Sequence, residues 1–187
     1  MKAFYQPIGK RIFDLFLSSL ILITVFPLLY IILGILIKLD TQGPVIFYQY
    51  RIGRGGRMFV IFKFRTYTYG CHSQVTRIGK ILRKFSLDEF PQFWNVLIGN
   101  MSIVGPRPFS REGAREWVLL HGYERRNEVL PGITGPSQVS RFRVAESMQG
   151  KISILKLDLE YVKKVSFGKD LGIILRTILL FFYPNGK

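Results

Sequence analysis

The longest uncharged segment of the chain is an apolar run of 23 residues, Leu15–Ile37, bounded by Asp14 and Lys38. At ~1.5 Å rise per residue, a helix over this run is roughly 34 Å long, enough to cross a hydrocarbon core of about 30 Å. The run is too long for a secretory signal and has no small-residue cleavage site. We therefore predict a membrane-inserted helix here rather than a buried helix of a soluble protein.

Pro27 lies in the middle of this run and leaves two membrane topologies open. A proline inside a helix removes one backbone hydrogen bond and favours a sharp kink. Basic residues flank both ends of the run, so the positive-inside rule favours neither orientation. A helix that bends at Pro27 and returns to the same face, a re-entrant helix, fits both facts. An ordinary spanning helix is the alternative, because neighbouring groups can satisfy the backbone that a proline frees.

The composition points to anionic partners. The 187 residues carry a formal net charge of +15, which fits nucleic acid, anionic lipid or a phosphorylated substrate. Because 48% of the residues are hydrophobic, the chain is too apolar for a disordered basic tail. The single cysteine, Cys71, excludes an internal disulfide. One cysteine and two histidines also argue against a zinc site with four nitrogen or sulfur ligands.

The charges are unevenly distributed around one pair of carboxylates. Between Thr41 and Arg111 there are eleven Lys or Arg residues and only two acids, the adjacent Asp88 and Glu89. A surface built for solubility would mix the two signs, so this pattern fits a site that binds a polyanion and acts on it. The alternative is that the two acids only open a helix, because Ser86–Glu89 has the form of a capping box. The local sequence does not decide between these interpretations.

Periodicity and turn residues outline the rest of the chain. Gly53–Arg57 forms a glycine-rich turn between two short strands, which predicts a β-hairpin. Leu171–Tyr183 is too short to span a membrane and predicts a helix lying in the membrane interface. The other predicted elements are strands over Val45–Arg51 and Met58–Arg65, a basic amphipathic helix over Arg77–Phe85, and helices over Ser110–Val129 and Leu155–Lys164.

An adjacent pair of acids among arginines suits phosphoryl transfer. A nucleophilic carboxylate forms an acyl-phosphate that is readily discharged to a second acceptor. A second carboxylate can hold Mg²⁺, a hard cation that also binds substrate phosphates. The metal and nearby arginines would offset the repulsion between a pyrophosphate and the attacking carboxylate.

A series of short motifs runs along most of the chain. The motifs are Lys10–Asp14, Ile37–Asp40, Gly43–Phe47, Gln49–Gly53, Lys63–Thr66, Thr76–Lys80, Leu82–Lys84, Ser86–Gln92, Asn95–Gly99, Met101–Pro108 and Pro131–Gly135. Each motif alone is weak, but their order and spacing are highly specific. With them the chain resembles the bacterial sugar transferases, the monotopic phosphoglycosyl transferases that start glycoconjugate assembly on polyprenyl phosphate.

The resemblance implies a two-step reaction with a covalent intermediate. Asp88 would attack the β-phosphate of a UDP-sugar, release UMP and hold the phosphosugar until polyprenyl phosphate accepts it. Glu89, with Asp88, would bind Mg²⁺. The resemblance assigns phosphate binding to Arg83 and Arg107. We add three further basic residues that lie in the matched motifs. The candidate phosphate-binding residues are Arg83, Arg107, Arg65, Lys63 and Arg51.

The resemblance also implies a fold and a location. We expect an α+β, mostly helical chain in which residues 1–40 form a re-entrant membrane helix kinked at Pro27. Residues 41–187 would form a catalytic domain with a small β-hairpin and amphipathic interfacial helices. This domain would rest on anionic lipid at the cytosolic face of the bacterial cytoplasmic membrane. The apolar C-terminal helix can serve either lipid or a second copy of the chain, so a homodimer remains open.

Two other functions deserve comparison with this expectation. A membrane-tethered nucleic-acid binder would explain the charge, but it gives no role to the Asp–Glu pair or to Pro27. Anionic lipid explains the charge more simply, at about 1 kcal/mol per basic residue near the surface, so we expect no nucleic-acid partner. A catalytically degenerate scaffold is the remaining alternative. It is suggested by departures from the family's common pattern at Phe26, Asn100 and Pro136.

Overall fold

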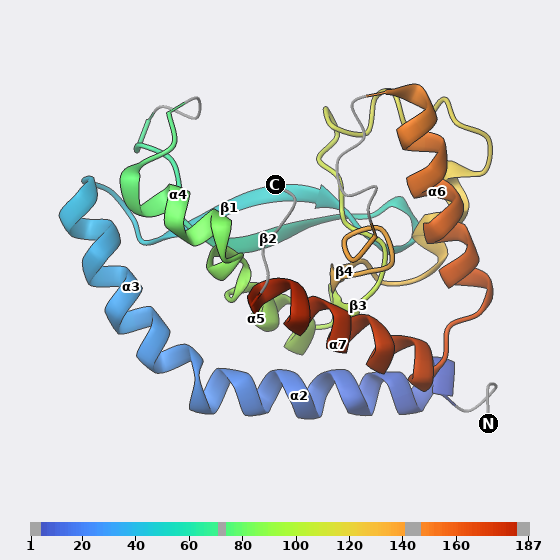
Figure 1. The fold of residues 1–187 in the computed structure, drawn as a ribbon, viewed down its shortest axis with the longest axis horizontal. Coiled ribbons are helices and arrows are strands. Elements are labelled where there is room, and N and C mark those ends of the chain that lie inside the picture. Colours follow the sequence, from blue (N-terminus) through green and yellow to red (C-terminus); the bar gives the residue numbers. More distant parts are fainter. Residues whose placement is uncertain (1–4, 71–73, 141–146, 183–187) are drawn as a thin grey trace.

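The computed structural model describes residues 5–70, 74–140 and 147–182 and shows a mostly helical α+β fold (Figure 1). This confirms the mixed, mostly helical fold expected from the sequence. The α-helices are α2 (Lys10–Thr24), α3 (Phe26–Asp40), α4 (Arg77–Lys84), α5 (Gln92–Leu97), α6 (Met148–Lys163) and α7 (Phe167–Phe182). The strands are β1 (Ile46–Ile52), β2 (Met58–Phe64), β3 (Ser102–Val104) and β4 (Gly132–Thr134). Short π or 3-10 turns are η1 (Tyr5–Gly9), η2 (Arg54–Gly56), η3 (Leu87–Glu89) and η4 (Tyr123–Glu128).

Helices α2 and α3 form a bent pair, with an angle of 54° between them (Figure 1). Pro27 lies in the first turn of α3, where its missing N–H is tolerated. One turn earlier, the Thr24 hydroxyl donates to the carbonyl of Leu20 at 2.7 Å, a bond that often bends helices. The predicted kink at Pro27 is therefore confirmed. In the described residues no single helix has the length and composition to cross a membrane, whereas the bent pair meets both criteria together.

The bent pair is fixed to the rest of the fold through α2. The Arg11 guanidinium donates to the carbonyls of Val96 at 2.6 Å and Leu97 at 2.8 Å, which satisfies the C-terminal end of α5. Asp14, only 1% exposed, accepts a hydrogen bond from the backbone amide of Ile103 in β3 at 3.1 Å. Because α5 follows the Asp88–Glu89 turn directly, α2 helps to place the carboxylate pair.

A second buried carboxylate joins the two ends of the chain. Asp170 of α7 is fully buried and forms an ion pair with Lys10 of α2 at 2.6 Å. It also accepts hydrogen bonds from the hydroxyls of Tyr5 and Tyr161, both at 2.6 Å. A buried charge is tolerated when its hydrogen-bonding capacity is filled in this way. The α2, α6 and α7 helices therefore meet at one polar point.

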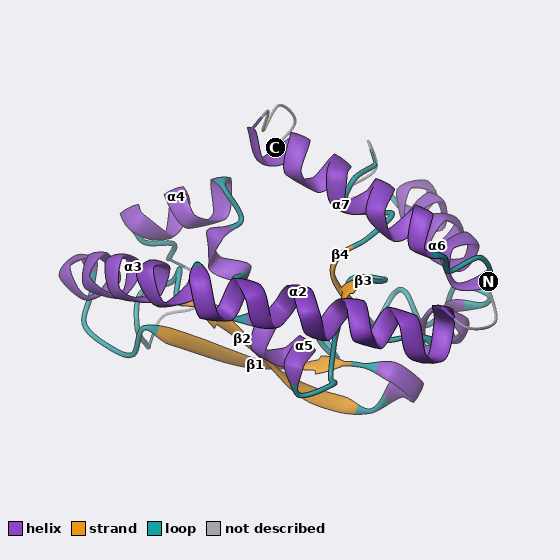
Figure 2. Cartoon of the chain, turned by 90° about the horizontal axis from the view of Figure 1, so that it is seen from below, coloured by secondary structure: helices purple, strands orange, loops and turns teal. Residues whose placement is uncertain are grey.

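The hairpin forms where the sequence predicts it. Strands β1 and β2 are antiparallel, with Tyr48 opposite Phe62. The connecting turn places Gly55 and Gly56 at φ of 64° and 76°, a region that other residues rarely adopt. The amide side chain of Asn95 in α5 donates to the carbonyl of Val60 at 2.6 Å and accepts from the amide of Phe62 at 3.0 Å. This places α5 between α2 and the hairpin, as Figure 2 shows.

The alternative interpretation of Ser86–Glu89 as a capping box is wrong. Ser86 adopts a left-handed conformation, with φ of 52°, and its side chain makes no capping bond. The segment Leu87–Glu89 is a separate 3-10 turn, and α5 begins only at Gln92. The physical reason is Pro91, which lacks an N–H and therefore resists incorporation into a helix begun at Ser86.

The helix predicted over Ser110–Val129 is also absent. This segment forms successive tight turns and the 3-10 helix η4 instead. Gly122, at φ of 84°, interrupts any regular helix immediately before η4. Packing also opposes helical periodicity, because Ala114, Trp117 and Tyr123 all enter one small apolar cluster.

Two further differences concern the second half of the chain. Helix α6 begins at Met148, seven residues before the predicted start at Leu155, because the Ser147 hydroxyl accepts from the Gly150 amide at 3.1 Å and caps it. The short parallel pair of β3 and β4 was not predicted from the sequence. The predicted C-terminal helix is confirmed as α7, and the last residue of its predicted range, Tyr183, lies outside the described residues.

Candidate active site

Asp88 and Glu89 lie in the turn η3, between α4 and α5. The neighbouring apolar residues Leu87 and Phe90 pack into a cluster that includes the buried side chains of Phe64 and Leu82. With these flanking residues held in the core, the turn presents its carboxylates to β2 and to the loop that follows β3. Asp88 itself is 8% exposed.

Two basic residues from distant parts of the chain hold Glu89. The Lys63 ammonium lies 2.7 Å and the Arg107 Nη2 lies 2.9 Å from the same carboxylate oxygen, Oε1 of Glu89. The Lys63 ammonium also lies 3.7 Å from Oδ2 of Asp88. Lys63 comes from β2 and Arg107 from the loop after β3, so the fold gathers these four residues into one charged cluster.

The two carboxylates have opposite pKa shifts. Burial raises the pKa of Asp88 above its usual value, an effect that Lys63 opposes and the neighbouring charge of Glu89 reinforces. Burial acts on Glu89 in the same direction, but the charges and hydrogen bonds of Arg107 and Lys63 outweigh it and lower its pKa to about 2. Glu89 is thus a permanent anion near neutral pH, and Asp88 is the more basic carboxylate. Such a split is typical of catalytic acid pairs.

Arg51 on β1 lies beside the cluster. Its Nη2 donates to Gln49 at 2.6 Å, but its Nε is buried and meets no acceptor among the described residues. Burial and the positive charge of Arg107 both lower the pKa of Arg51. Buried donors are nearly always satisfied in proteins, so the unpartnered Nε of Arg51 is an unusual feature of this site.

Arg83 at the end of α4 is oriented by two neighbours. Its Nε donates to the hydroxyl of Thr66 at 3.0 Å, and its guanidinium stacks 4.2 Å above the ring of Tyr67. Its positive charge also favours the ionised form of Asp88. The structure therefore places Arg83 at the same cluster as Lys63, Arg107 and Arg51.

Arg65 differs from the other predicted phosphate-binding residues. It is 4% exposed, and its three guanidinium nitrogens all donate hydrogen bonds within the protein. The acceptors are the carbonyls of Pro44, Thr41 and Tyr67 and the hydroxyl of Thr41. This arrangement ties the α3–β1 connection to the end of β2, and we do not retain Arg65 as a phosphate ligand.

The carboxylate pair has the donor chemistry for magnesium. In the described ranges, no group of three or more His, Cys, Asp or Glu side chains is placed to hold a metal by itself. Mg²⁺ usually takes one or two carboxylates and completes its shell with water and substrate phosphates. Two adjacent carboxylates beside basic side chains fit that pattern, whereas they do not fit a closed structural metal site.

Two residues that hold the Arg107 loop, one directly and one through the other, carry no recognisable signal in the sequence. Arg126 donates to the backbone carbonyl of Arg107 at 2.9 Å and forms a buried ion pair with Asp158 of α6 at 2.8 Å. No motif in the sequence analysis included either residue. Their separation of 32 positions gives no local signal, because only the packing of η4 against α6 brings them together.

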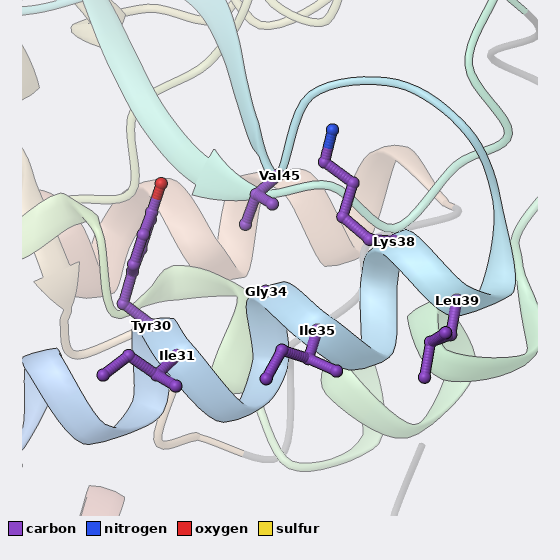
Figure 3. A pocket seen from close by; sticks show the side chains of 7 residues that line it. All are labelled: Tyr30, Ile31, Gly34, Ile35, Lys38, Leu39 and Val45. Atoms are coloured by element: carbon purple, nitrogen blue, oxygen red, sulfur yellow. The ribbon is translucent and has the colours of Figure 1, made fainter.

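A separate groove of about 410 Å³ runs along α3 (Figure 3). Its walls are almost entirely apolar, and the ammonium of Lys38 points across its upper side in that view. It shares no residue with the carboxylate cluster. The lining residues are Tyr30, Ile31, Gly34, Ile35, Lys38, Leu39 and Val45.

Comparison with known proteins agrees with the motifs. The family described as bacterial sugar transferase matches residues 5–183. The chain is 40% identical to a UDP-glucose:undecaprenyl-phosphate glucose-1-phosphate transferase of Klebsiella pneumoniae, over 90% of this chain and 39% of the relative. It is 38% identical to a UDP-N-acetylgalactosamine-undecaprenyl-phosphate N-acetylgalactosaminephosphotransferase of Aeromonas hydrophila, over 90% and 42% of the two chains.

The relatives differ in length. The chain spans about two fifths of the Klebsiella and Aeromonas proteins, 39% and 42% respectively. By contrast, it covers 93% of the exopolysaccharide production protein PSS of Rhizobium leguminosarum bv. phaseoli, to which it is 36% identical over 91% of its own length. The family match therefore extends over nearly the whole described fold, including the bent helix pair and the carboxylate cluster. The chain belongs to the bacterial sugar transferase family.

Proposed function

We propose that this chain is a phosphoglycosyl transferase that moves a sugar-1-phosphate from a UDP-sugar to polyprenyl phosphate and releases UMP. The observation that carries the proposal is the buried carboxylate of Asp88 beside Glu89, which Lys63 and Arg107 hold in place. The names of the Klebsiella and Aeromonas relatives describe a transfer to undecaprenyl phosphate, which is the acceptor we propose here. The product would begin the assembly of an exopolysaccharide or another surface glycan.

In the first step, a carboxylate oxygen of Asp88 attacks the β-phosphorus of the UDP-sugar. A new bond forms between this oxygen and phosphorus, and the bond from phosphorus to the bridging oxygen of the diphosphate breaks. UMP leaves with that electron pair, and the sugar phosphate remains on Asp88 as an acyl-phosphate. The raised pKa of Asp88 favours this role, because a more basic carboxylate is a better nucleophile once it is ionised.

In the second step, an oxygen of polyprenyl phosphate attacks the same phosphorus. The bond between phosphorus and Asp88 breaks, the carboxylate is regenerated, and a polyprenyl-diphosphate sugar is released. The acceptor is a monoester anion, so this step also brings negative charge toward Asp88. The cationic residues around the pair lower that repulsion.

The basic residues have distinct roles in this proposal. Arg51 on β1 and Arg83, near Asp88, bind phosphate oxygens of the donor. Lys63 contacts both carboxylates, and its positive charge favours the ionised form of Asp88 against the effect of burial. Arg107 fixes Glu89 and adds a positive charge at the edge of the cluster. Mg²⁺ bound by Asp88 and Glu89 would neutralise charge on the diphosphate.

The proposal includes the position of the chain at the membrane. Residues 1–40 would form the membrane element, with α2 and α3 entering and leaving on the same side, and residues 41–187 the catalytic domain on the cytosolic face. The apolar side chains along the bent pair support this, since Phe16 is 68% exposed and Leu39 is 79% exposed. The basic helix α4 and the amphipathic helix α7 would rest on anionic lipid headgroups.

Release of UMP tests the reaction directly. Purified protein in detergent or nanodiscs would be mixed with Mg²⁺, undecaprenyl phosphate and a panel of UDP-sugars that includes glucose and N-acetylgalactosamine. We expect UMP, not UDP, from at least one donor, because attack at the β-phosphate cleaves the diphosphate between its two phosphorus atoms. UDP as the product would indicate direct glycosyl transfer. If folded protein releases no UMP from any donor in the panel, the catalytically degenerate scaffold would be favoured.

Cysteine labelling in intact cells tests the re-entrant topology. Cys71 would be replaced by Ser, and single cysteines would be introduced as Ala3→Cys and Glu112→Cys, one on each side of the bent pair. We expect both positions to be protected from a membrane-impermeant maleimide until the cells are permeabilised. Labelling of Ala3→Cys alone in intact cells would show that the bent pair spans the membrane.

A further inference from the structure

A buried arginine lies directly behind the loop that carries Arg107. Arg126 of η4 is 3% exposed, and its Nη2 donates to the backbone carbonyl of Arg107 at 2.9 Å. The side chain of Arg107 extends from the same residue to Glu89 at 2.9 Å. Arg126 therefore contacts the peptide group of Arg107, whose side chain in turn holds a proposed catalytic carboxylate.

Asp158 fixes the orientation of Arg126. Its Oδ2 accepts from Nε of Arg126 at 3.2 Å and from Nη2 at 2.8 Å, and it is fully buried in α6. Two aromatic rings complete the enclosure, because the guanidinium lies 4.4 Å from the ring centre of Phe109 and 5.5 Å from that of Tyr123. With one nitrogen shared between Asp158 and the Arg107 carbonyl, the guanidinium has little freedom to rotate.

Backbone hydrogen bonds also hold the loop on both sides of Arg107, and one of them, from the Gly132 amide to the Pro106 carbonyl at 3.0 Å, lies directly before it. On one side, the Gly105 amide donates to the Thr134 carbonyl at 2.9 Å. On the other side, the Ile52 amide donates to the Phe109 carbonyl at 2.8 Å. The prolines at positions 106 and 108 have no N–H to donate, so backbone carbonyls carry much of the bonding in this loop, and the bond from Arg126 is the one made to the carbonyl of Arg107 itself.

We propose that Arg126 is a positioning residue that, oriented by Asp158, holds the Arg107 peptide so that the Arg107 side chain reaches Glu89. The proposal rests on the proposed function, because its effect on rate requires that Arg107 and Glu89 belong to the active site. A buried ion pair is a weak source of stability, since replacement by apolar residues is often neutral or favourable. Conformational specificity at the loop is the role that the contacts of Arg126 favour.

Arg126→Lys tests the proposal with limited disturbance of the fold. Lysine retains the positive charge opposite Asp158, but a single ammonium cannot reproduce the planar fork that serves both acceptors. We expect kcat/KM for UMP release to fall by on the order of 10- to 100-fold, since displacements near 1 Å have effects of that size. The matched control is Arg125→Lys, the exposed neighbour on η4, for which we expect unchanged activity.

A double-mutant cycle separates positioning from general structural support. In an Arg107→Ala background there is no Arg107 side chain left to orient, so Arg126→Lys should then lower kcat/KM by less than about threefold. Equal fold losses in both backgrounds would overturn the proposal, because they would mean that Arg126 does not act through Arg107. Wild-type activity in Arg126→Lys would also overturn it.

Hydrogen exchange gives a second measurement that does not depend on turnover. Exchange followed by mass spectrometry should be faster in peptides covering residues 103–110 of Arg126→Lys than in the wild type, with Arg125→Lys matching the wild type. Unchanged exchange would overturn the proposed positioning even for an active enzyme. If the wild-type chain releases no UMP from any donor, the proposed function fails separately, and faster exchange would still support the effect of Arg126 on the loop.

Discussion

Asp88→Asn should abolish UMP release, with a loss on the order of 10³-fold or more, while the protein remains folded and membrane-bound. Asparagine has nearly the same shape as aspartate, but its amide is not a nucleophile and forms no acyl-phosphate. The measurement is UMP release together with mass spectrometry of the protein after incubation with the active donor. The wild type should carry a phosphosugar on a peptide containing Asp88, and the variant should not. Normal turnover of the variant would show that another residue is the nucleophile.

The same substitution should also stabilise the fold at neutral pH. Burial raises the folded-state pKa of Asp88, so protonation favours the folded state. That contribution is fully present below the carboxyl's pKa in the unfolded chain and is lost as the pH rises through the raised folded-state pKa. Above that raised pKa the wild type carries a poorly solvated charge that the neutral asparagine lacks.

Thermal unfolding in detergent measures this effect. We expect a higher midpoint for Asp88→Asn than for the wild type at neutral pH, with the difference shrinking as the pH falls toward 4. The control is Glu124→Gln, which removes an exposed charge from η4 and should leave the midpoint nearly unchanged. A lower midpoint for Asp88→Asn would indicate that the ionised Asp88 carboxylate stabilises the fold, which would contradict this prediction.

Glu89→Gln should lower turnover by on the order of 10²-fold and have the opposite effect on stability. The glutamine removes the charge that Lys63 approaches at 2.7 Å and Arg107 at 2.9 Å, so Arg107 loses this anionic partner and Lys63 keeps only Asp88, at 3.7 Å. It also removes one of the two carboxylates proposed for Mg²⁺. We expect the Mg²⁺ concentration for half-maximal activity to rise at least about tenfold, since supporting ligands change metal affinity by such factors.

The pH dependence of stability distinguishes the two carboxylates. The pKa of Glu89 is lowered to about 2 in the folded state, so its charge stabilises the fold above its unfolded pKa. This stabilisation is lost as the pH falls toward 2. Glu89→Gln should therefore lower the unfolding midpoint at neutral pH, and this deficit should narrow in acid. If Glu89→Gln stabilised the protein and Asp88→Asn destabilised it, the assigned roles would be reversed.

Several features of the fold were predictable because their causes are local. The kink at Pro27 follows from the missing N–H of one residue. The hairpin follows from two short strands joined by glycines, of which Gly55 and Gly56 adopt positive φ. The position of Asp88 and Glu89 among basic residues followed from charge pattern and motif order. Each of these signals lies within a few residues or within a fixed motif, so it can be recognised without the tertiary structure.

The predictions from sequence failed where contacts between distant parts of the chain override the local sequence pattern. Ser110–Val129 has a charged, helix-like composition, yet its side chains fill a cluster with α6 and the chain adopts tight turns. Lys63 and Arg65 are two residues apart and looked equivalent as phosphate ligands. In the structure Lys63 meets the carboxylates, whereas Arg65 lies beyond the end of β2 and bonds the α3–β1 connection.

The sequence by itself determined the family, the bent apolar helix and the identity of the carboxylate pair. Only the tertiary structure decided which cations reach that pair and how each is held. The Lys63–Glu89 and Arg107–Glu89 contacts join residues 26 and 18 positions apart, and the Arg126–Asp158 pair behind them is 32 apart. The physical reason is that a long basic side chain can point in many directions, and its final contacts depend on which buried groups the folded chain brings within reach.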